Sequence, residues 1–142
     1  MATLITLAEA IIARLQAGTF SLPFEVQRGY RPALELPDLA AVRVTVIPKS
    51  LAVSQAARSG NFYDCTIDIG VQRKVSPDIP AELDALMGLV EEIGDHLRGQ
   101  SLPGMPEAAW LWLENEPVFA PEHLEQQHLF TSVLSLTYRV RR

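Results

Sequence analysis

Four polar side chains fall on one face of one predicted strand: Asp64, Asp68, Gln72 and Lys74. Carboxylates followed by a lysine are typical of metal-dependent nuclease centres, where the acids hold the metal ions that activate water. The spacing here is loose, and no acidic partner is evident upstream. Alternating polar residues are also what any solvent-facing strand shows. The plainer interpretation places Asp64 and Asp68 on a solvent face or an inter-subunit face.

Other residues that could do chemistry are few. His96, His123 and His128 lack metal-ligand spacing. The single cysteine, Cys65, has no evident histidine partner and falls on the apolar side of a strand, where we expect it to pack. The sequence shows no glycine-rich phosphate loop, zinc-finger spacing or helix-turn-helix punctuation. It therefore predicts no catalytic centre, metal site or cofactor, and a protein that is not an enzyme.

The strand that carries Asp64 belongs to a strand–turn–helix unit at residues 61–99. Apolar residues from Tyr63 to Val71 alternate with the polar ones, the pattern of a half-buried strand. After a break at residues 76–80, one helical stripe follows: Leu83, Leu86, Met87, Val90, Ile93 and Leu97. Asp78 is the expected N-cap, Gly99 the expected stop, and Gly94 lies on the stripe, where it predicts a close approach to the sheet.

The flanking segments predict a helix and four further strands. An amphipathic helix begins between Thr3 and Leu7, with Thr6 and Glu9 as a capping box, and ends at Gly18. Alternation predicts strands at residues 24–30, 42–46, 110–113 and 130–140. We expect the first to end at residues 31–32, a prolyl linker at 35–38, the second strand to end at Pro48, and a loop at 121–127.

The order of these elements, α-β-β-β-α-β-β, predicts the fold class. Consecutive strands without crossover helices indicate an α+β domain in which helices flank a mostly antiparallel sheet. A chain of 142 residues fits a single domain over residues 1–142. The expected core lies on the apolar stripes: Ile11, Leu15, Val44, Ile67, Ile69, Leu86, Val90, Ile93, Leu134 and Leu136.

Two segments are expected to contact partners. Residues 49–60 are small and polar and longer than a tight hairpin needs, which predicts a mobile loop that presents Lys49 and Arg58. The strand around Trp110 and Trp112 is apolar on both faces. It is therefore expected to be covered by the core on one side and by another surface on the other.

Charge is distributed unevenly along the chain. The net charge is −5, yet residues 82–125 hold ten acidic residues and one basic residue, so the remainder is net positive. Such polarity can give one molecule two complementary surfaces, although a solvated acidic helix face explains it equally well. No apolar run reaches the ~20 residues of a membrane span, and Glu9 and Arg14 interrupt the N-terminal run, so neither a membrane segment nor a signal peptide is expected.

Three stretches of the chain carry a family resemblance. They are FEVQRGYRP at residues 24–32 after an N-terminal helix, the helix that runs from Ala81 to Leu97, and the final strand SVLSLTYRV at 132–140. In pattern and element order the chain resembles the small tail-terminator, or tail-completion, proteins of long-tailed bacteriophages and prophages. The match covers the whole chain, and no individual functional residue carries over from it.

The resemblance implies a structural role and a set of partners. It implies a homo-oligomeric ring, a hexamer, that caps the tail tube, stops tube polymerisation and joins the tail to the head–tail connector. DNA would pass through the lumen without sequence-specific binding. The protein would assemble in the cytoplasm of the bacterial host and reside in the virion tail.

Residue reasoning leaves alternatives open. They are another head–tail connector or minor tail component, and a metal-dependent nuclease built on Asp64, Asp68 and Lys74. The residues assigned to subunit or tube contacts are Lys49, Arg58, Asp64, Asp68, Trp110 and Trp112, and of these Lys49 and Arg58 are also assigned to lumen contacts.

Overall fold

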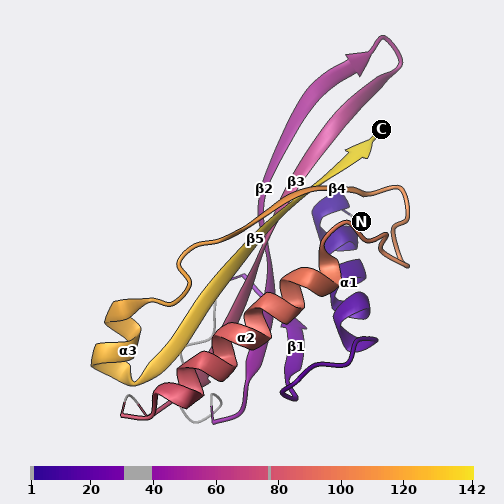
Figure 1. The fold of residues 1–142 in the computed structure, drawn as a ribbon. Coiled ribbons are helices and arrows are strands. Elements are labelled where there is room, and N and C mark those ends of the chain that lie inside the picture. Colours follow the sequence, from indigo (N-terminus) through magenta and orange to yellow (C-terminus); the bar gives the residue numbers. More distant parts are fainter. Residues whose placement is uncertain (1, 31–39, 77) are drawn as a thin grey trace.

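A five-stranded sheet with two long helices on one face forms the body of the molecule (Figure 1). The computed structural model describes residues 2–30, 40–76 and 78–142. The elements are α1 (Thr3–Gln16), β1 (Glu25–Arg28), β2 (Arg43–Ala57), β3 (Gly60–Lys74), α2 (Pro80–Leu97), β4 (Ala109–Asn115), α3 (Pro121–Gln127) and β5 (Leu129–Arg141).

The strands lie in the order β1-β2-β3-β5-β4. Only the short β1–β2 pair is parallel, and the three other pairs are antiparallel. The predicted α+β class with a mostly antiparallel sheet is therefore confirmed, and so is the order of the predicted elements. No helix in the described part of the chain is long and apolar enough to cross a membrane.

The core lies between the sheet and helices α1 and α2. Alternate residues of β3 and β5 turn their side chains toward the helices, which gives the sheet an inner face. All ten residues predicted for the core are buried. Gly94 of α2 approaches the sheet closely, because a Cβ atom there would lie 3.3 Å from Cδ1 of Leu113. This confirms the contact expected of a glycine on the apolar stripe.

The C-terminal ends of the two long helices are tied together. The Arg14 guanidinium of α1 donates to the carbonyl oxygen of His96 at 3.3 and 3.4 Å, and His96 Nε2 lies 2.9 Å from the carbonyl oxygen of Arg14. Gly18 allows this approach, since a Cβ atom would come within 2.9 Å of His96 Nε2. These contacts fix both helices over the same face of the sheet.

Two predicted caps are wrong. Helix α1 begins at Thr3 with Ala2 as N-cap, so Thr6 lies inside the helix, where its hydroxyl is 3.3 Å from the carbonyl oxygen of Ala2. Helix α2 begins with Pro80 in its first turn and Ile79 as N-cap in place of Asp78. Proline is preorganised for the first helical position and has no N–H to leave unpaired, so a side-chain cap is less needed. The stop at Gly99 is confirmed by its φ of 65°.

Other boundaries also differ from the predictions. Residues 121–127 were expected to form a loop but form helix α3. None of its side chains is buried, so the sequence carries no apolar stripe that would predict a helix there. Strand β1 spans Glu25–Arg28 only. The expected stop at residues 31–32 and the linker at 35–38 lie outside the described residues.

The largest correction concerns residues 49–60, which are strand and turn instead of a loop. Strand β2 passes through Pro48 with a register shift between Pro48 and Ser50, and then pairs with β3 as far as Ala57 and Gly60. Proline is tolerated at bulges and on edge strands, and β2 is an edge strand here because its pairing with β1 ends at Val46. We call residues 49–60 the hairpin arm. Figure 1 shows this arm extending beyond both long helices.

Candidate functional site

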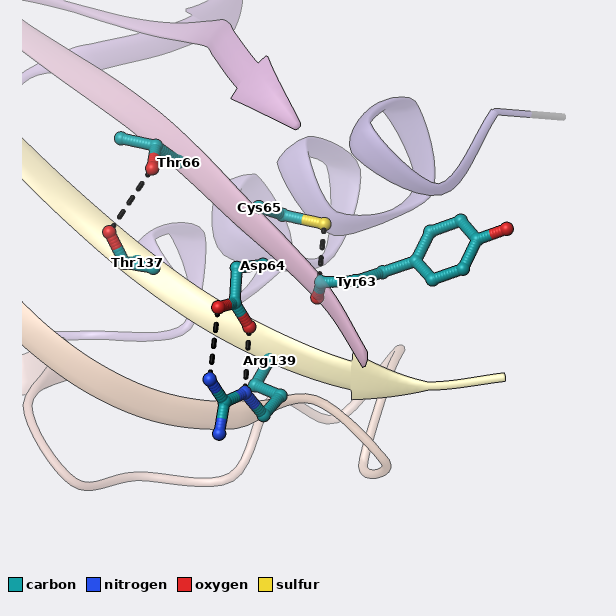
Figure 2. Close-up of polar contacts among 6 residues, drawn as sticks. All are labelled: Tyr63, Asp64, Cys65, Thr66, Thr137 and Arg139. Carbon is teal, nitrogen blue, oxygen red and sulfur yellow. Dashed lines mark hydrogen bonds and ion pairs between the residues drawn. The ribbon is translucent and has the colours of Figure 1, made fainter. Parts of the chain in front are cut away.

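The sheet face opposite α1 and α2, called the outer face below, carries cross-strand polar pairs between β3 and β5. Arg139 donates to both carboxylate oxygens of Asp64, at 2.7 and 3.0 Å. The hydroxyls of Thr66 and Thr137 lie 3.1 Å apart. Figure 2 shows these two pairs side by side. Directly opposed pairs of this kind stabilise an antiparallel sheet, so these residues have a structural use within one chain.

The second aspartate of the outer face is also paired. Asp68 accepts a hydrogen bond of 2.6 Å from the Ser135 hydroxyl, and Lys49 Nζ lies 3.7 Å from the same carboxylate. The predicted nuclease set does not converge: Gln72 is buried and donates to Thr131, whereas Lys74 is exposed at the strand end. Within residues 2–30, 40–76 and 78–142, no group of three or more acidic, histidine or cysteine side chains could hold a metal ion.

Electrostatics agree with paired, charged groups on this face. The hydrogen bond from Arg139 lowers the pKa of Asp64, and the same bond raises the pKa of Arg139. Asp64 is therefore ionised at neutral pH and held by its partner, whereas a general base needs a pKa near the working pH. Cys65, on the opposite face of β3, is buried, and burial raises the pKa of its thiol. It is the packing residue that the sequence predicted.

The hairpin arm exposes apolar side chains that sequence reasoning did not assign to any site. Leu51 and Val53 are 45% and 54% exposed. Both pair with inner-face residues of β3, Cys65 and Tyr63, so both point to the helix side of the sheet. They alternate with Ser50 and Ala52, and this period-2 pattern was the signal that could have revealed a strand.

A second exposed apolar feature lies on β4, at the other edge of the sheet. The core covers one side of this strand, as predicted, and the surface expected on its other side stays a prediction. Trp110 is half-buried against the core, but Leu111 and Trp112 are 38% and 47% exposed. A register shift between Trp110 and Trp112 makes Leu111 the extra residue. No described element covers Trp112, so any covering surface must come from outside this part of the chain.

A groove of about 330 Å³ runs between α2 and β4 on the inner side of the sheet. Its apolar lining includes Met87, Leu113 and Val118. Its charged lining comes from Glu91, Asp95 and Arg98, of which the last two form an ion pair of 3.4 Å. The nearby end of β4 is also acidic. A hydrogen bond with Glu116 raises the pKa of Glu114, because two carboxyl groups lie together there.

The site residues assigned from sequence thus form two groups in space. Lys49, Asp64 and Asp68 lie on or beside the outer face, and Arg58 lies at the tip of the arm. Trp110 and Trp112 lie on β4, at the opposite edge of the sheet from β2. The structure brings no catalytic constellation together from them. It presents instead a basic arm on one edge and an acidic, apolar strand on the other.

Comparisons with known proteins show a likeness of fold. No family model matches the sequence, and no curated protein matches it. Among solved structures, one chain from "Virion of native gene transfer agent (GTA) particle" has the same fold, with a TM-score of 0.57 and 16% sequence identity. The match covers 95% of this chain and 92% of that chain, so the shared fold extends over nearly the whole length of both.

Proposed function

We propose that this chain is a structural protein of a phage or prophage tail, a tail terminator that closes into a ring on the end of the tail tube. The observation that carries the proposal is the whole-length fold match to a chain of a gene transfer agent virion. Among the possible components of a virion, we propose a tail terminator because the sequence resembles tail-completion proteins. The proposed protein is not an enzyme, and it acts by binding the end of the tail tube and blocking further growth.

The two unlike sheet edges support a ring. A head-to-tail contact uses two different patches of one subunit, and it closes into a ring when the rotation between neighbours completes a circle. The arm holds Lys49 and Arg58 and no acidic residue, whereas residues 101–129, which include β4, hold five acidic residues and no basic one. Opposite charges on the two edges favour one arrangement of neighbours over others.

The proposed ring is a hexamer between the tail tube and the head–tail connector, with DNA passing through its lumen. It assembles in the cytoplasm of the bacterial host and becomes part of the virion tail. Contacts with DNA in such a lumen are electrostatic and independent of sequence. The groups proposed for contacts with phosphates or with an acidic neighbour are the charges of the arm: Lys49, whose Nζ lies 3.7 Å from Asp68 of its own chain, and Arg58.

Deletion of the gene in its phage or prophage tests the proposal, with tails measured by electron microscopy. Loss of a terminator gives tubes of uncontrolled length, and supplying the chain in trans restores a single length. Loss of another connector or minor tail component gives tails of normal length that fail to join heads or to infect. Normal tails on infectious particles would exclude every version of this function.

A further inference from the structure

The sheet has two free strand edges in the described part of the chain. From Ser50 to Ala57, β2 pairs with β3 on one side only. Strand β4 pairs with β5 on one side only and ends the sheet order. Each free edge presents unpaired backbone N–H and C=O groups, which form a template for another strand.

The strand directions allow these two edges to join between copies. Successive neighbours β2, β3, β5 and β4 are antiparallel, so β2 and β4 run in opposite directions. Rotation about an axis along the strands preserves strand direction. The β2 edge of one copy would therefore meet the β4 edge of the next as an antiparallel pair, the arrangement with well-aligned hydrogen bonds.

The side chains of the two edges match in that arrangement. Leu51 and Val53 point to the inner side, and the groove beside β4 opens on the inner side with Leu113 in its wall. A strand added to β4 in the plane of the sheet places its inner-side residues over this groove. Val53 opposite Leu113 pairs two inner-face residues, and the same register sets Ala52 opposite Glu114 on the outer face.

Two bases of the hairpin arm and two acids that flank β4 have the same separation along the chain. Lys49 and Arg58 stand nine positions apart, and so do Glu107 and Glu116. With Val53 opposite Leu113, Lys49 comes within one residue of Glu116, and Arg58 comes within one residue of Glu107. Each base thus lies near an acid of the next copy, and this charge complementarity favours the contact between the two edges.

We propose that the hairpin arm of one copy adds as a strand to the β4 edge of the next copy, with Leu51 and Val53 in the groove between α2 and β4. The inference rests on the proposed ring and names the contact that closes it. It also assigns a use to the exposed Leu111 and Trp112, because an added strand reduces the exposure of this edge.

Disulfide cross-linking tests the proposed register in the full chain. Ala52→Cys and Glu114→Cys are combined in one protein, and both native side chains are exposed, so folding is retained. Native Cys65 is buried and stays out of reach. Oxidation is expected to give a ladder of covalent dimers and larger species on a denaturing gel. The matched control, Ala52→Cys with Glu122→Cys on α3, and each single variant are expected to give no ladder.

A second variant tests the apolar contact. In the cross-linking background, Leu51→Ser with Val53→Ser is expected to abolish the ladder. Gln55→Ser, a change on the inner face of the same strand, is expected to keep it. Circular dichroism melts of all variants show that the body stays folded. A ladder that survives the loss of Leu51 and Val53 would overturn the seating of these side chains in the groove.

The mass and electron micrographs of the unmodified chain separate this inference from the ring. A ring that forms without cross-linking between positions 52 and 114 would overturn the strand addition and leave the proposed function intact. Linkage of the Ala52→Cys single variant to itself would mean a two-fold contact, and linkage only to tail-tube protein would make the tube the occupant. Either result would overturn the inference. A chain that stays monomeric even on tail tubes would overturn both proposals.

Discussion

Replacing Ile93 by aspartate gives the most direct test of the fold. Ile93 lies one turn before the C-terminal end of α2, is fully buried, and does not line the groove beside β4. The substitution removes the burial of one large aliphatic side chain, worth roughly 1.5–3 kcal/mol. It also places a carboxylate in the core without a partner, at a cost of several kcal/mol. Together these losses rival the roughly 5–15 kcal/mol by which domains are stable.

We therefore expect Ile93→Asp to be unfolded or insoluble at neutral pH. The assay is a urea titration followed by far-ultraviolet circular dichroism, with Ile93→Val and Ala85→Asp beside it. Ile93→Val removes one methyl group and should cost about 0.5–1.5 kcal/mol. Ala85→Asp puts the same carboxylate on the exposed side of the same helix, where only helix propensity is lost, less than about 1 kcal/mol.

A soluble Ile93→Asp protein that melts cooperatively, within about 2 kcal/mol of Ala85→Asp, would refute this reasoning. It would mean that α2 does not pack this face on the sheet. The inner and outer faces assigned to every strand would then lose their basis, including the inward direction of Leu51 and Val53. The experiment therefore also tests a premise of the strand-addition model.

Three further predictions address the site. Purified protein incubated with plasmid and Mg²⁺ or Mn²⁺ should not cleave DNA, and cleavage that disappears in Asp68→Ala would restore the nuclease hypothesis. Asp64→Asn should reduce stability by up to about 1 kcal/mol at pH 7, because the pair with Arg139 is partly exposed. The pKa of Asp64 is lowered in the folded state, so ionised Asp64 contributes to the free energy of unfolding above the unfolded pKa of 3.8, and this contribution is lost as pH falls through the folded pKa. The stabilities of the wild type and Asp64→Asn should therefore become equal in acid. A difference in stability that stays constant at all pH values would contradict this prediction. Lys49→Glu with Arg58→Glu should lower the thermal midpoint of the isolated chain only slightly, because the Lys49–Asp68 pair that it removes is long and partly exposed. The double variant should nevertheless impair ring formation or tail completion. Normal infectious particles would show that the charges of the arm are not needed for the proposed function.

The sequence predicted the body of the fold because burial imposes a period. Val44, Ile67 and Leu136 are buried on one face of their strands, and their polar neighbours face the other way, so alternation was readable. The stripe of α2 was readable for the same reason. The parallel pairing of β1 with β2 was not predictable, because a strand of four residues carries too short a pattern to indicate its partner or its direction.

The errors occurred where the chain buries little. The hairpin arm was predicted as a loop because its side chains are small and Pro48 looked like a stop, although Leu51 and Val53 keep a strand period. Helix α3 was predicted as a loop because it buries no side chain. Where side chains are not buried, no hydrophobic period marks a helix or strand in the sequence. The secondary structure there depends on local backbone geometry, which composition alone does not specify.

For the candidate site, the sequence indicated which strand face carries the acids but not the partners of those acids. Sequence placed Asp64 and Asp68 on one face correctly, yet their partners lie on β5, some seventy residues away in the chain. No single-sequence pattern indicates which strand lies beside β3. The sequence also did not indicate which strands lie at the edges of the sheet, because that depends on the order of the strands in the sheet.

The energetics of the two sheet edges support the proposed assembly role. On the outer face, Asp64 and Asp68 already have partners, so binding a metal there would first require breaking those contacts. At the arm and at β4 the balance is reversed: apolar side chains and backbone groups are exposed, and a neighbouring strand would bury them. The partly exposed pair between Lys49 and Asp68 is the contact that Lys49 would give up to reach an acid of the neighbour. The arm also extends beyond the helices that cover the core, so no described element of its own chain covers it (Figure 1). Beyond its pairing with β3, a strand in that position would gain stabilisation from another chain, and the edge of opposite charge on a second copy is complementary to it.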